Sequence, residues 1–334
     1  MIENGRLIGL GLALVDHKIK NKEVLLPQNI NDLPVFLDKH DGIIHMSAGG
    51  PICNTLMAFI SYLPQQSIVR LYSAIGEDKK GEFFRQHTSE KLGPPQINSP
   101  KTTGLWACVI DESTNEIKEK LSYYGAAQTV SISKKDVAEE KNTLFITDVS
   151  SCKFPDILNQ AEDVLPELKR EGGLFVLSLN GARPSAVSNT YLDSMFRSLP
   201  YQPQIIFANQ AELLYVTGKT NLQDAIYTAF PSSQLLITTC GKDGAIIRFE
   251  GDVTTIPTYT VEKDKVTDET GAGDAFMGTM LAVLYPRLFS MDKKIITKAA
   301  KIASYAGALI TQTLNSRVAN EQVALIQKYA KSVD

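Results

Sequence analysis

The chain has 334 residues, of which 43% are hydrophobic and 21% are charged, and its formal net charge is −3. This is the composition of a folded globular protein, and the length is enough for one large domain or two ordinary ones. Charges of both signs are spread along the chain with no block of like charge, which argues against nucleic acid or a membrane surface as a partner.

The N-terminal apolar run Leu7–Val15 is too short to span a bilayer, and it ends at Asp16. We expect it to be a buried first strand. The cysteines show no metal-ligand or CxxC spacing, and they lie far apart at Cys53, Cys108, Cys152 and Cys240. Unpaired cysteines among apolar neighbours behave as small core residues, so we expect a reducing, cytoplasmic setting.

Continuous apolar segments alternate with helix-like segments along most of the chain. The expected strands are Leu7–Val15, Val69–Ile75, Leu144–Val149, Leu174–Leu179, Ile205–Ala208 and Leu235–Thr239. The expected helices are Ile52–Tyr62, Gly81–Leu92, Phe154–Lys169, Ser188–Leu199, Gln210–Val216, Asn221–Phe230, Ala275–Tyr285, Met291–Leu314 and Asn320–Ala330. This alternation predicts an α/β fold in which a mostly parallel sheet is covered by helices on both faces.

Two segments depart from the alternation. Residues 18–45 are polar and contain prolines and short β-like pieces, whereas residues 103–124 alternate in polarity. Both patterns predict extended strands outside the main core, and two such segments could pair as a small sheet that covers a site. We therefore expect one domain over residues 1–334, with lid segments at approximately 17–46 and 97–125.

A glycine-rich turn, Thr270-Gly271-Ala272-Gly273-Asp274, directly precedes a helix-like run. Backbone N–H groups at a helix N-terminus favour an anion such as phosphate. Asp274 would repel phosphate, but it could accept the proton of a hydroxyl that attacks a phosphoryl group. The alternative is an ordinary tight turn in which Asp274 caps the helix. The turn is neither a Walker loop nor a dinucleotide fingerprint, because the spacing fits neither pattern.

The segment Asp268–Asp274 resembles the signature DTxGAGD of the ribokinase-like (PfkB) family of carbohydrate and nucleoside kinases, with Glu269 where that family often has threonine. The resemblance implies a three-layer α/β/α fold with a mostly parallel central sheet and a small β lid. It also implies that the backbone of Gly271, Ala272 and Gly273 forms an anion hole and that Asp274 is the catalytic base. ATP and Mg²⁺ are implied as well, and a K⁺ ion near Asp268 and Thr270 is left open.

The segment Gly49–Asn54 resembles the GGxxxN motif of the same family. The resemblance implies that Gly49, Gly50 and Asn54 bind the substrate, and that Asp16 holds substrate hydroxyl groups from the end of the first strand. From the residues alone, these are a glycine turn with a polar residue on the next helix and a surface carboxylate. Gly76–Gly81 resembles the family's GxDxxG, which implies a mostly structural role, and we assign it no chemistry.

Asn209-Gln210-Ala211-Glu212 resembles the NxxE motif, which implies that Glu212 organises Mg²⁺ through water; a capped helix start is the alternative. Thr239–Gly244 resembles TxGxxG beside the nucleotide. The residues implied to bind ATP are Asn180, Asn209, Thr239, Gly241 and Gly244. The glycine that usually follows the adenine-facing helix is absent, with Leu314-Asn315-Ser316 in its place, so the adenine pocket is left unassigned.

The adenosine-kinase-like branch is indicated by the Thr103-Gly104 strand, by Ala126-Ala127 and by the long insertion at 18–45. Many members of that branch phosphorylate sugars, so we expect a sugar kinase, with a nucleoside kinase as the alternative. Trp106 could stack on a base, pack on a sugar face or belong to the small sheet's core. A non-catalytic regulator is a further alternative, which Asp274 argues against. We expect a small-molecule partner, and either a monomer or a homodimer.

Overall fold

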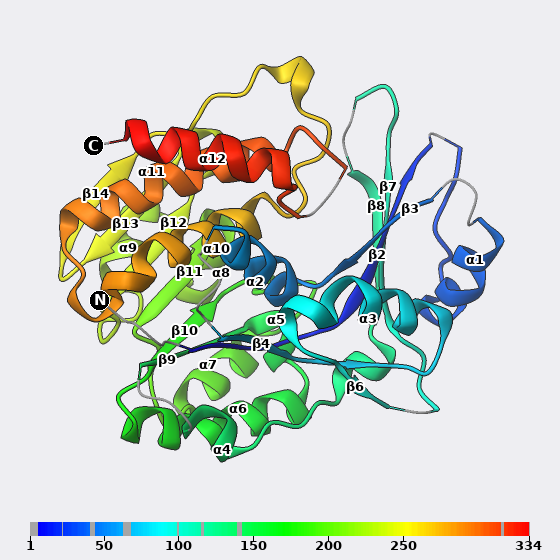
Figure 1. Cartoon of the computed structure of the whole chain (residues 1–334), viewed down its shortest axis with the longest axis horizontal. Coiled ribbons are helices and arrows are strands. Elements are labelled where there is room, and N and C mark those ends of the chain that lie inside the picture. The colour runs from blue at the N-terminus through cyan, green and yellow to red at the C-terminus, as the bar shows by residue number, and fades with distance from the viewer. Residues whose placement is uncertain are drawn as a thin grey trace.

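The computed structural model describes residues 6–21, 23–40, 44–62, 68–98, 100–114, 117–138, 142–314 and 317–333. Its largest element is an eight-stranded sheet in the order β14-β13-β12-β11-β10-β9-β1-β4 (Figure 1). The strands are β1 (Arg6–Leu10), β4 (Ile68–Tyr72), β9 (Thr143–Asp148), β10 (Leu174–Ser178), β11 (Ile205–Asn209), β12 (Leu235–Thr239), β13 (Ala245–Phe249) and β14 (Asp252–Ile256). The pairs from β4 to β12 are parallel, and β13 and β14 add an antiparallel hairpin, so the predicted mostly parallel sheet is confirmed.

Helices cover both faces of this sheet and make three layers (Figure 1). Alternate strand residues point to opposite faces, so Leu144 and Ile205 belong to one hydrophobic core, whereas Phe145 and Ile206 belong to the other. On the first face lie α2 (Pro51–Tyr62), α3 (Lys79–Leu92), α10 (Ala272–Leu284) and α11 (Lys293–Ile310), with α12 (Asn320–Ser332) packed on α11. On the second lie α4 (Lys134–Ala138), α5 (Val149–Cys152), α6 (Pro155–Arg170), α7 (Asn189–Ser198), α8 (Gln210–Thr217) and α9 (Leu222–Thr228).

A second sheet of four strands projects from the main body, with α1 (Leu33–Lys39) beside it (Figure 1). Its order is β3-β2-β7-β8, formed by β2 (Leu14–Lys20), β3 (Ile44–Gly49), β7 (Gly104–Ile110) and β8 (Ile117–Tyr123). The two predicted excursions therefore pair with each other, through the parallel contact of β2 with β7. Two details were wrong. The first excursion contains the helix α1 as well as strands. The second lies partly inside the main core, since Leu105, Ala107 and Val109 are buried in the same core as α2.

The predicted strand Leu7–Val15 was wrong, because the chain changes sheet within it. β1 ends at Leu10, the N–H of Gly11 donates to the carbonyl oxygen of Tyr72, and β2 begins at Leu14 in the second sheet. Residues on both sides of this crossing are buried, so hydrophobicity alone does not reveal where the chain leaves the first sheet. Asp16 consequently lies inside β2 and not at the end of a main-sheet strand.

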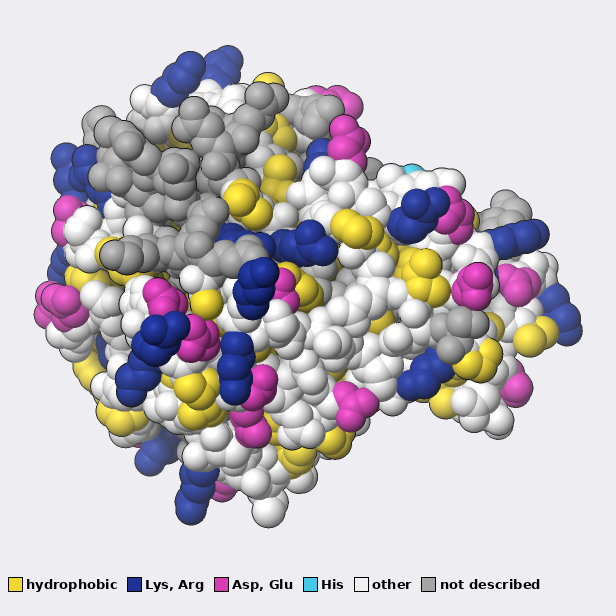
Figure 2. Space-filling model, turned by 60° about the horizontal axis from the view of Figure 1, so that its bottom comes forward, with side chains coloured by type: hydrophobic (Ala, Val, Ile, Leu, Met, Phe, Trp, Pro, Cys, Tyr) yellow, Lys and Arg dark blue, Asp and Glu magenta, His cyan; other side chains and the backbone are white. Residues whose placement is uncertain are grey.

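The predicted strand Val69–Ile75 also divides in two. β4 ends at Tyr72, and the short strand β5 (Ala74–Ile75) pairs with β6 (Gln96–Ile97) instead of continuing the main sheet. In the face shown in Figure 2, acidic and basic side chains lie interspersed over the surface. None of the helices in the described ranges has the length and apolar character needed to cross a membrane.

Candidate active site

The glycine-rich turn forms the N-terminus of α10. The N-cap residue Gly271 has φ 86°, in the left-handed region where glycine costs least. Thr270, Gly271, Gly273 and Asp274 line a cavity of about 320 Å³. The N–H groups of a first helical turn have no partner within the helix and favour an anion. Ala272 differs from its neighbours, because its N–H donates to the carbonyl oxygen of Glu269 at 3.2 Å. The N–H of Thr270 is also engaged, since it donates to Oδ1 of Asp268. The donors for an anion are therefore expected at Gly271, Gly273 and Asp274.

Asp274 meets α2 in this cavity. Nδ2 of Asn54 donates to Oδ2 of Asp274 at 3.3 Å. Burial raises the pKa of Asp274 well above its usual range, and the Asn54 hydrogen bond opposes that shift. The carboxylates of Asp148, Asp16 and Glu212 raise the pKa further. A carboxylate with a raised pKa next to a cavity is a suitable proton acceptor for a hydroxyl.

Asp16 and Asn54 line the same cavity from β2 and α2, and both are buried. A Cβ added at Gly49 would lie 2.1 Å from Oδ2 of Asp16, so the absence of a side chain at Gly49 leaves room for this carboxylate. Oδ1 of Asn54 has no hydrogen-bond donor within reach in the described structure. A buried acceptor of this kind is normally satisfied, and a hydroxyl of a bound ligand would satisfy it here. Gly50 also lines the cavity, whereas Gly49 does not line it and lies against the Asp16 carboxylate.

The second sheet supplies one wall of the cavity. Trp106 of β7 lies opposite Asp16 on one side and Ser122 of β8 on the other, so all three side chains share a face. Lys120 of β8 and Tyr124 continue this wall. Trp106 is half-buried and is the only tryptophan of the chain. The sheet thus places aromatic and polar groups opposite the N-terminus of α10.

The residues predicted to bind ATP lie along one edge of the main sheet. Asn180, just after β10, lines the cavity. Asn209 and Thr239 are paired at the carboxyl ends of β11 and β12, and the turn with Gly241 and Gly244 follows β12. Those four residues are not among the lining of this cavity. They form a row that leads away from it along the sheet edge, where open α/β sheets bind ligands.

Glu212 is fixed by the start of α8. The N–H of Asn209 donates to Oε2 of Glu212, and the N–H of Glu212 donates to Oδ1 of Asn209, both at 2.9 Å. Burial raises the pKa of Glu212, and the charge of Asp148 adds to the shift. Within the described ranges, no three His, Cys, Asp or Glu side chains are arranged to hold a metal directly. The carboxylates around the cavity nevertheless repel one another, which suits a divalent ion that keeps most of its waters, as Mg²⁺ does.

The sequence analysis missed several residues of the site. Asp148 is fully buried at the end of β9, where its Oδ1 accepts the N–H of Ser151 and its Oδ2 accepts the hydroxyl of Ser150, each at 2.9 Å. The sequence does mark Asp148, because it is an acidic residue at the carboxyl end of an apolar strand, the end at which other site residues follow their strands. Arg183 and Lys120 bring two positive charges to the cavity, and nothing in their local pattern marks them.

Asp268 does not fit the K⁺ site that the sequence left open. Its Oδ2 accepts a hydrogen bond from Nζ of Lys18 at 2.5 Å, and its Oδ1 accepts the N–H of Thr270 at 2.9 Å. The side chains of Lys18 and Asp268 are each only 1% exposed. The carboxylate at which the resemblance left a K⁺ ion open is therefore already paired with the ammonium group of Lys18.

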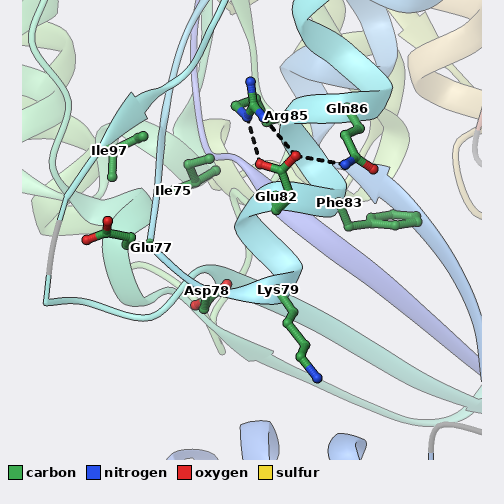
Figure 3. Close-up of a pocket in the computed structure, with 10 residues that line it drawn as sticks. Ile75, Glu77, Asp78, Lys79, Glu82, Phe83, Arg85, Gln86 and Ile97 are labelled. Carbon is green, nitrogen blue, oxygen red and sulfur yellow. Dashed lines mark hydrogen bonds and ion pairs between the residues drawn. The ribbon is translucent and has the colours of Figure 1, made fainter.

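A second hollow, of about 580 Å³, lies between α3 and the strands β5 and β6 (Figure 3). Two of its charged groups pair with each other, since Glu82 accepts hydrogen bonds from Arg85, and Gln86 donates a further one to Glu82. Asp78 caps α3 through the N–H of Gly81 and also accepts the N–H of Thr103, both at 2.7 Å. The Gly76–Gly81 motif thus joins α3 to the start of β7, in agreement with the structural role expected for it.

Residues 32–322 match the family described as pfkB family carbohydrate kinase. The chain belongs to this family. The adenosine kinase of Schizosaccharomyces pombe (strain 972 / ATCC 24843) is 25% identical over 309 residues, which cover 83% of the chain and 87% of that relative.

Two solved kinase structures share the fold. A fructokinase double mutant from Vibrio cholerae O395, in a fructose, ADP and potassium ion bound form, has a TM-score of 0.78 at 19% identity, covering 98% of each chain. Aminoimidazole riboside kinase from Salmonella enterica, complexed with aminoimidazole riboside and an ATP analog, has a TM-score of 0.77 at 19% identity, covering 97% of this chain and 99% of the other.

Proposed function

We propose that this pfkB kinase transfers the γ-phosphoryl group of ATP to a hydroxyl of a small sugar bound in the cavity at the N-terminus of α10. The observation that carries the proposal is the meeting of Asp274 with Asn54 beside Asp16, at a helix N-terminus that favours phosphate. A proton acceptor, hydroxyl-binding groups and anion donors are the parts that phosphoryl transfer to an alcohol needs.

In the proposed reaction, Asp16 accepts hydrogen bonds from substrate hydroxyls, and Oδ1 of Asn54 gains the donor that it lacks. Asp274 takes the proton of the attacking hydroxyl as its oxygen forms a bond to the γ-phosphorus. The bond from that phosphorus to the β–γ bridging oxygen breaks, and ADP leaves. First-turn N–H groups of α10 stabilise the charge on the transferred group.

The row of Asn209, Thr239, Gly241 and Gly244 would hold ATP along the sheet edge, with Asn180 near the transferred phosphate. We propose Mg²⁺ as the divalent ion, held near Glu212 through water, because neighbouring carboxylates raise the pKa of Glu212 and of Asp274. Such an ion neutralises phosphate charge when it is bound. Glu212 itself is kept in place by its reciprocal bonds with Asn209.

The second sheet is proposed to act as a lid within a single domain, because Trp106 and Ser122 face Asp16 across the cavity. We propose that the protein acts as a monomer or a homodimer. Cys53, Cys108, Cys152 and Cys240 are unpaired, which favours a reducing compartment such as the cytoplasm.

A nucleoside is the second candidate acceptor, and the cavity wall is compatible with it. Trp106 and Tyr124 are aromatic, and Leu12 and Leu14 extend the apolar surface next to them. An aromatic face of this kind suits a heterocyclic base as well as the apolar face of a sugar. The similarity to an adenosine kinase over most of the chain supports the same candidate.

The test is a panel of sugars and nucleosides incubated with ATP and Mg²⁺, with the phosphorylated product identified by mass spectrometry. Because Trp106 is the only tryptophan, its fluorescence reports ligand entry independently of turnover. A phosphorylated sugar supports the first candidate and a phosphorylated nucleoside the second. Fluorescence changes without product for any ligand would favour a non-catalytic binding protein.

A further inference from the structure

The contact between Lys18 and Asp268 joins two parts of the chain that are 250 positions apart. Nζ of Lys18 lies 2.5 Å from Oδ2 of Asp268, and both side chains are almost completely buried. An ion pair at this depth has little water to stabilise either charge, so each group depends on the other. Removing one partner would leave an uncompensated buried charge.

The position of the pair links it to the cavity. Lys18 is two residues beyond Asp16 on β2, so the two side chains share a face of the second sheet, and Asp16 lines the cavity. Asp268 is two residues before Thr270, whose N–H donates to the other carboxylate oxygen. Thr270 begins the turn that leads into α10 and lines the cavity. The ammonium group is thus tied, through one carboxylate, to the turn proposed to bind phosphate.

We propose that the ammonium group of Lys18 is a built-in monovalent cation for the phosphate-binding turn, and that this protein needs no dissolved potassium ion. The inference rests on the proposed kinase function where it concerns rates, but not where it concerns binding of the cation. The fructokinase with a similar fold is in a potassium ion bound form, whereas here the Asp268 carboxylate already holds a cation carried by the chain.

The positive charge of Lys18 has a clear physical role beside Asp268. A buried, unpaired carboxylate behind a turn that must receive phosphate would oppose the incoming anion. The Lys18 ammonium cancels that charge, and its hydrogen bond fixes Asp268, which in turn fixes the N–H of Thr270. Lys18 is therefore a positioning residue that acts through Asp268 and touches no substrate.

The first experiment compares the wild-type protein in potassium, sodium and tetramethylammonium chloride at equal ionic strength. We expect the melting temperature and kcat to be the same in all three salts. A melting temperature or kcat that rises specifically in potassium overturns the proposal, because it reveals a separate site for that ion. The melting temperature remains informative even if no substrate is found, so failure of the kinase assignment is distinguishable from failure of this inference.

The second experiment uses Lys18→Ala, which removes the three methylenes and the ammonium beyond Cβ. We expect a lower melting temperature in tetramethylammonium and a kcat reduced about tenfold or more. Propylammonium has the shape and charge of the missing group, so it should raise both values, whereas neutral propanol should raise neither. The KM for the hydroxyl substrate should stay within about twofold of the wild-type value, since Lys18 does not line the cavity.

Two variants serve as controls. Lys20→Ala removes an exposed lysine from the same strand, and it should match the wild type in every salt. Lys18→Ala combined with Asp268→Asn removes both charges, so it should melt above Lys18→Ala and lose its response to propylammonium. The proposal is overturned if propylammonium fails to raise the melting temperature of Lys18→Ala, or if that variant retains full kcat in tetramethylammonium.

Discussion

Gly49→Ala offers a sharp test of how the substrate side of the cavity is built. The added Cβ would lie 2.1 Å from Oδ2 of Asp16 and 2.4 Å from its Cγ, whereas ordinary van der Waals contact begins at 3.4 Å. The carboxylate would therefore have to move by 3.4 − 2.1 = 1.3 Å. A shift of about 1 Å in a group that positions substrate can cost on the order of 100-fold in rate. We expect kcat/KM for the hydroxyl substrate to fall by about that factor.

The assay is steady-state kinetics with each substrate varied in turn. The KM for ATP should change little, because Gly49 and Asp16 lie on the sugar side. Gly218→Ala is the matched control, since it places a Cβ at a left-handed helix end with nothing within 4 Å. It should lower the melting temperature but leave kcat/KM unaltered.

A double-mutant cycle isolates the mechanism. Once Asp16→Ala has removed the carboxylate, a Cβ at Gly49 has nothing left to displace, so Gly49→Ala should then cost less than about threefold. An equal loss in both backgrounds would refute the reasoning, because it would mean that Gly49 acts by a route other than Asp16.

Three further predictions concern the carboxylates. Because burial raises the folded-state pKa of Asp274 above its unfolded value, the stability that this group contributes is fully present at low pH and is lost as pH rises through the folded pKa. Asp274→Asn should therefore raise the melting temperature at neutral pH, and the gain should shrink on acidification; a lower melting temperature at pH 7 contradicts this. The wild-type kcat should fall as pH drops through the same pKa, since a protonated Asp274 cannot accept a proton; a flat acid limb argues against its role. Glu212→Gln should raise the Mg²⁺ concentration for half-maximal rate by about tenfold, and an unchanged Mg²⁺ titration removes Glu212 from the metal site.

The sequence predicted the parts of the fold that have strong local patterns. Buried parallel strands such as Ile205–Ala208 are continuous apolar runs, and the structure extends that strand by one residue, to Asn209. The glycine-rich turn marked the start of α10, which begins at Ala272, three residues before the predicted start. Asn54 and Asp274 were each named from short motifs, and the structure brings them together across 220 positions. The resemblance to the family's motifs was needed there, because the residues alone left an ordinary glycine turn or a capped helix open.

The remaining features depend on contacts that no local pattern records. The crossing from β1 to β2 is buried on both sides, so it has the same composition as one long strand. Lys18 has the sequence setting of a solvated strand end, and only the approach of Asp268 makes it a buried partner. Asp148 could have been found from its place at the end of an apolar strand, but the groups whose pKa its charge raises, Asp274 and Glu212, lie far along the chain.

The most direct test of the central claim is a single-turnover measurement with ATP labelled in its γ-phosphate, comparing the wild type with Asp274→Asn. The amide is similar in size to the carboxylate and can still accept a hydrogen bond from Asn54, so both substrates should bind with comparable Kd values. We predict that the wild type transfers the label to the acceptor hydroxyl and that the variant does so at least about 100-fold more slowly. Transfer at the wild-type rate by Asp274→Asn would contradict the account.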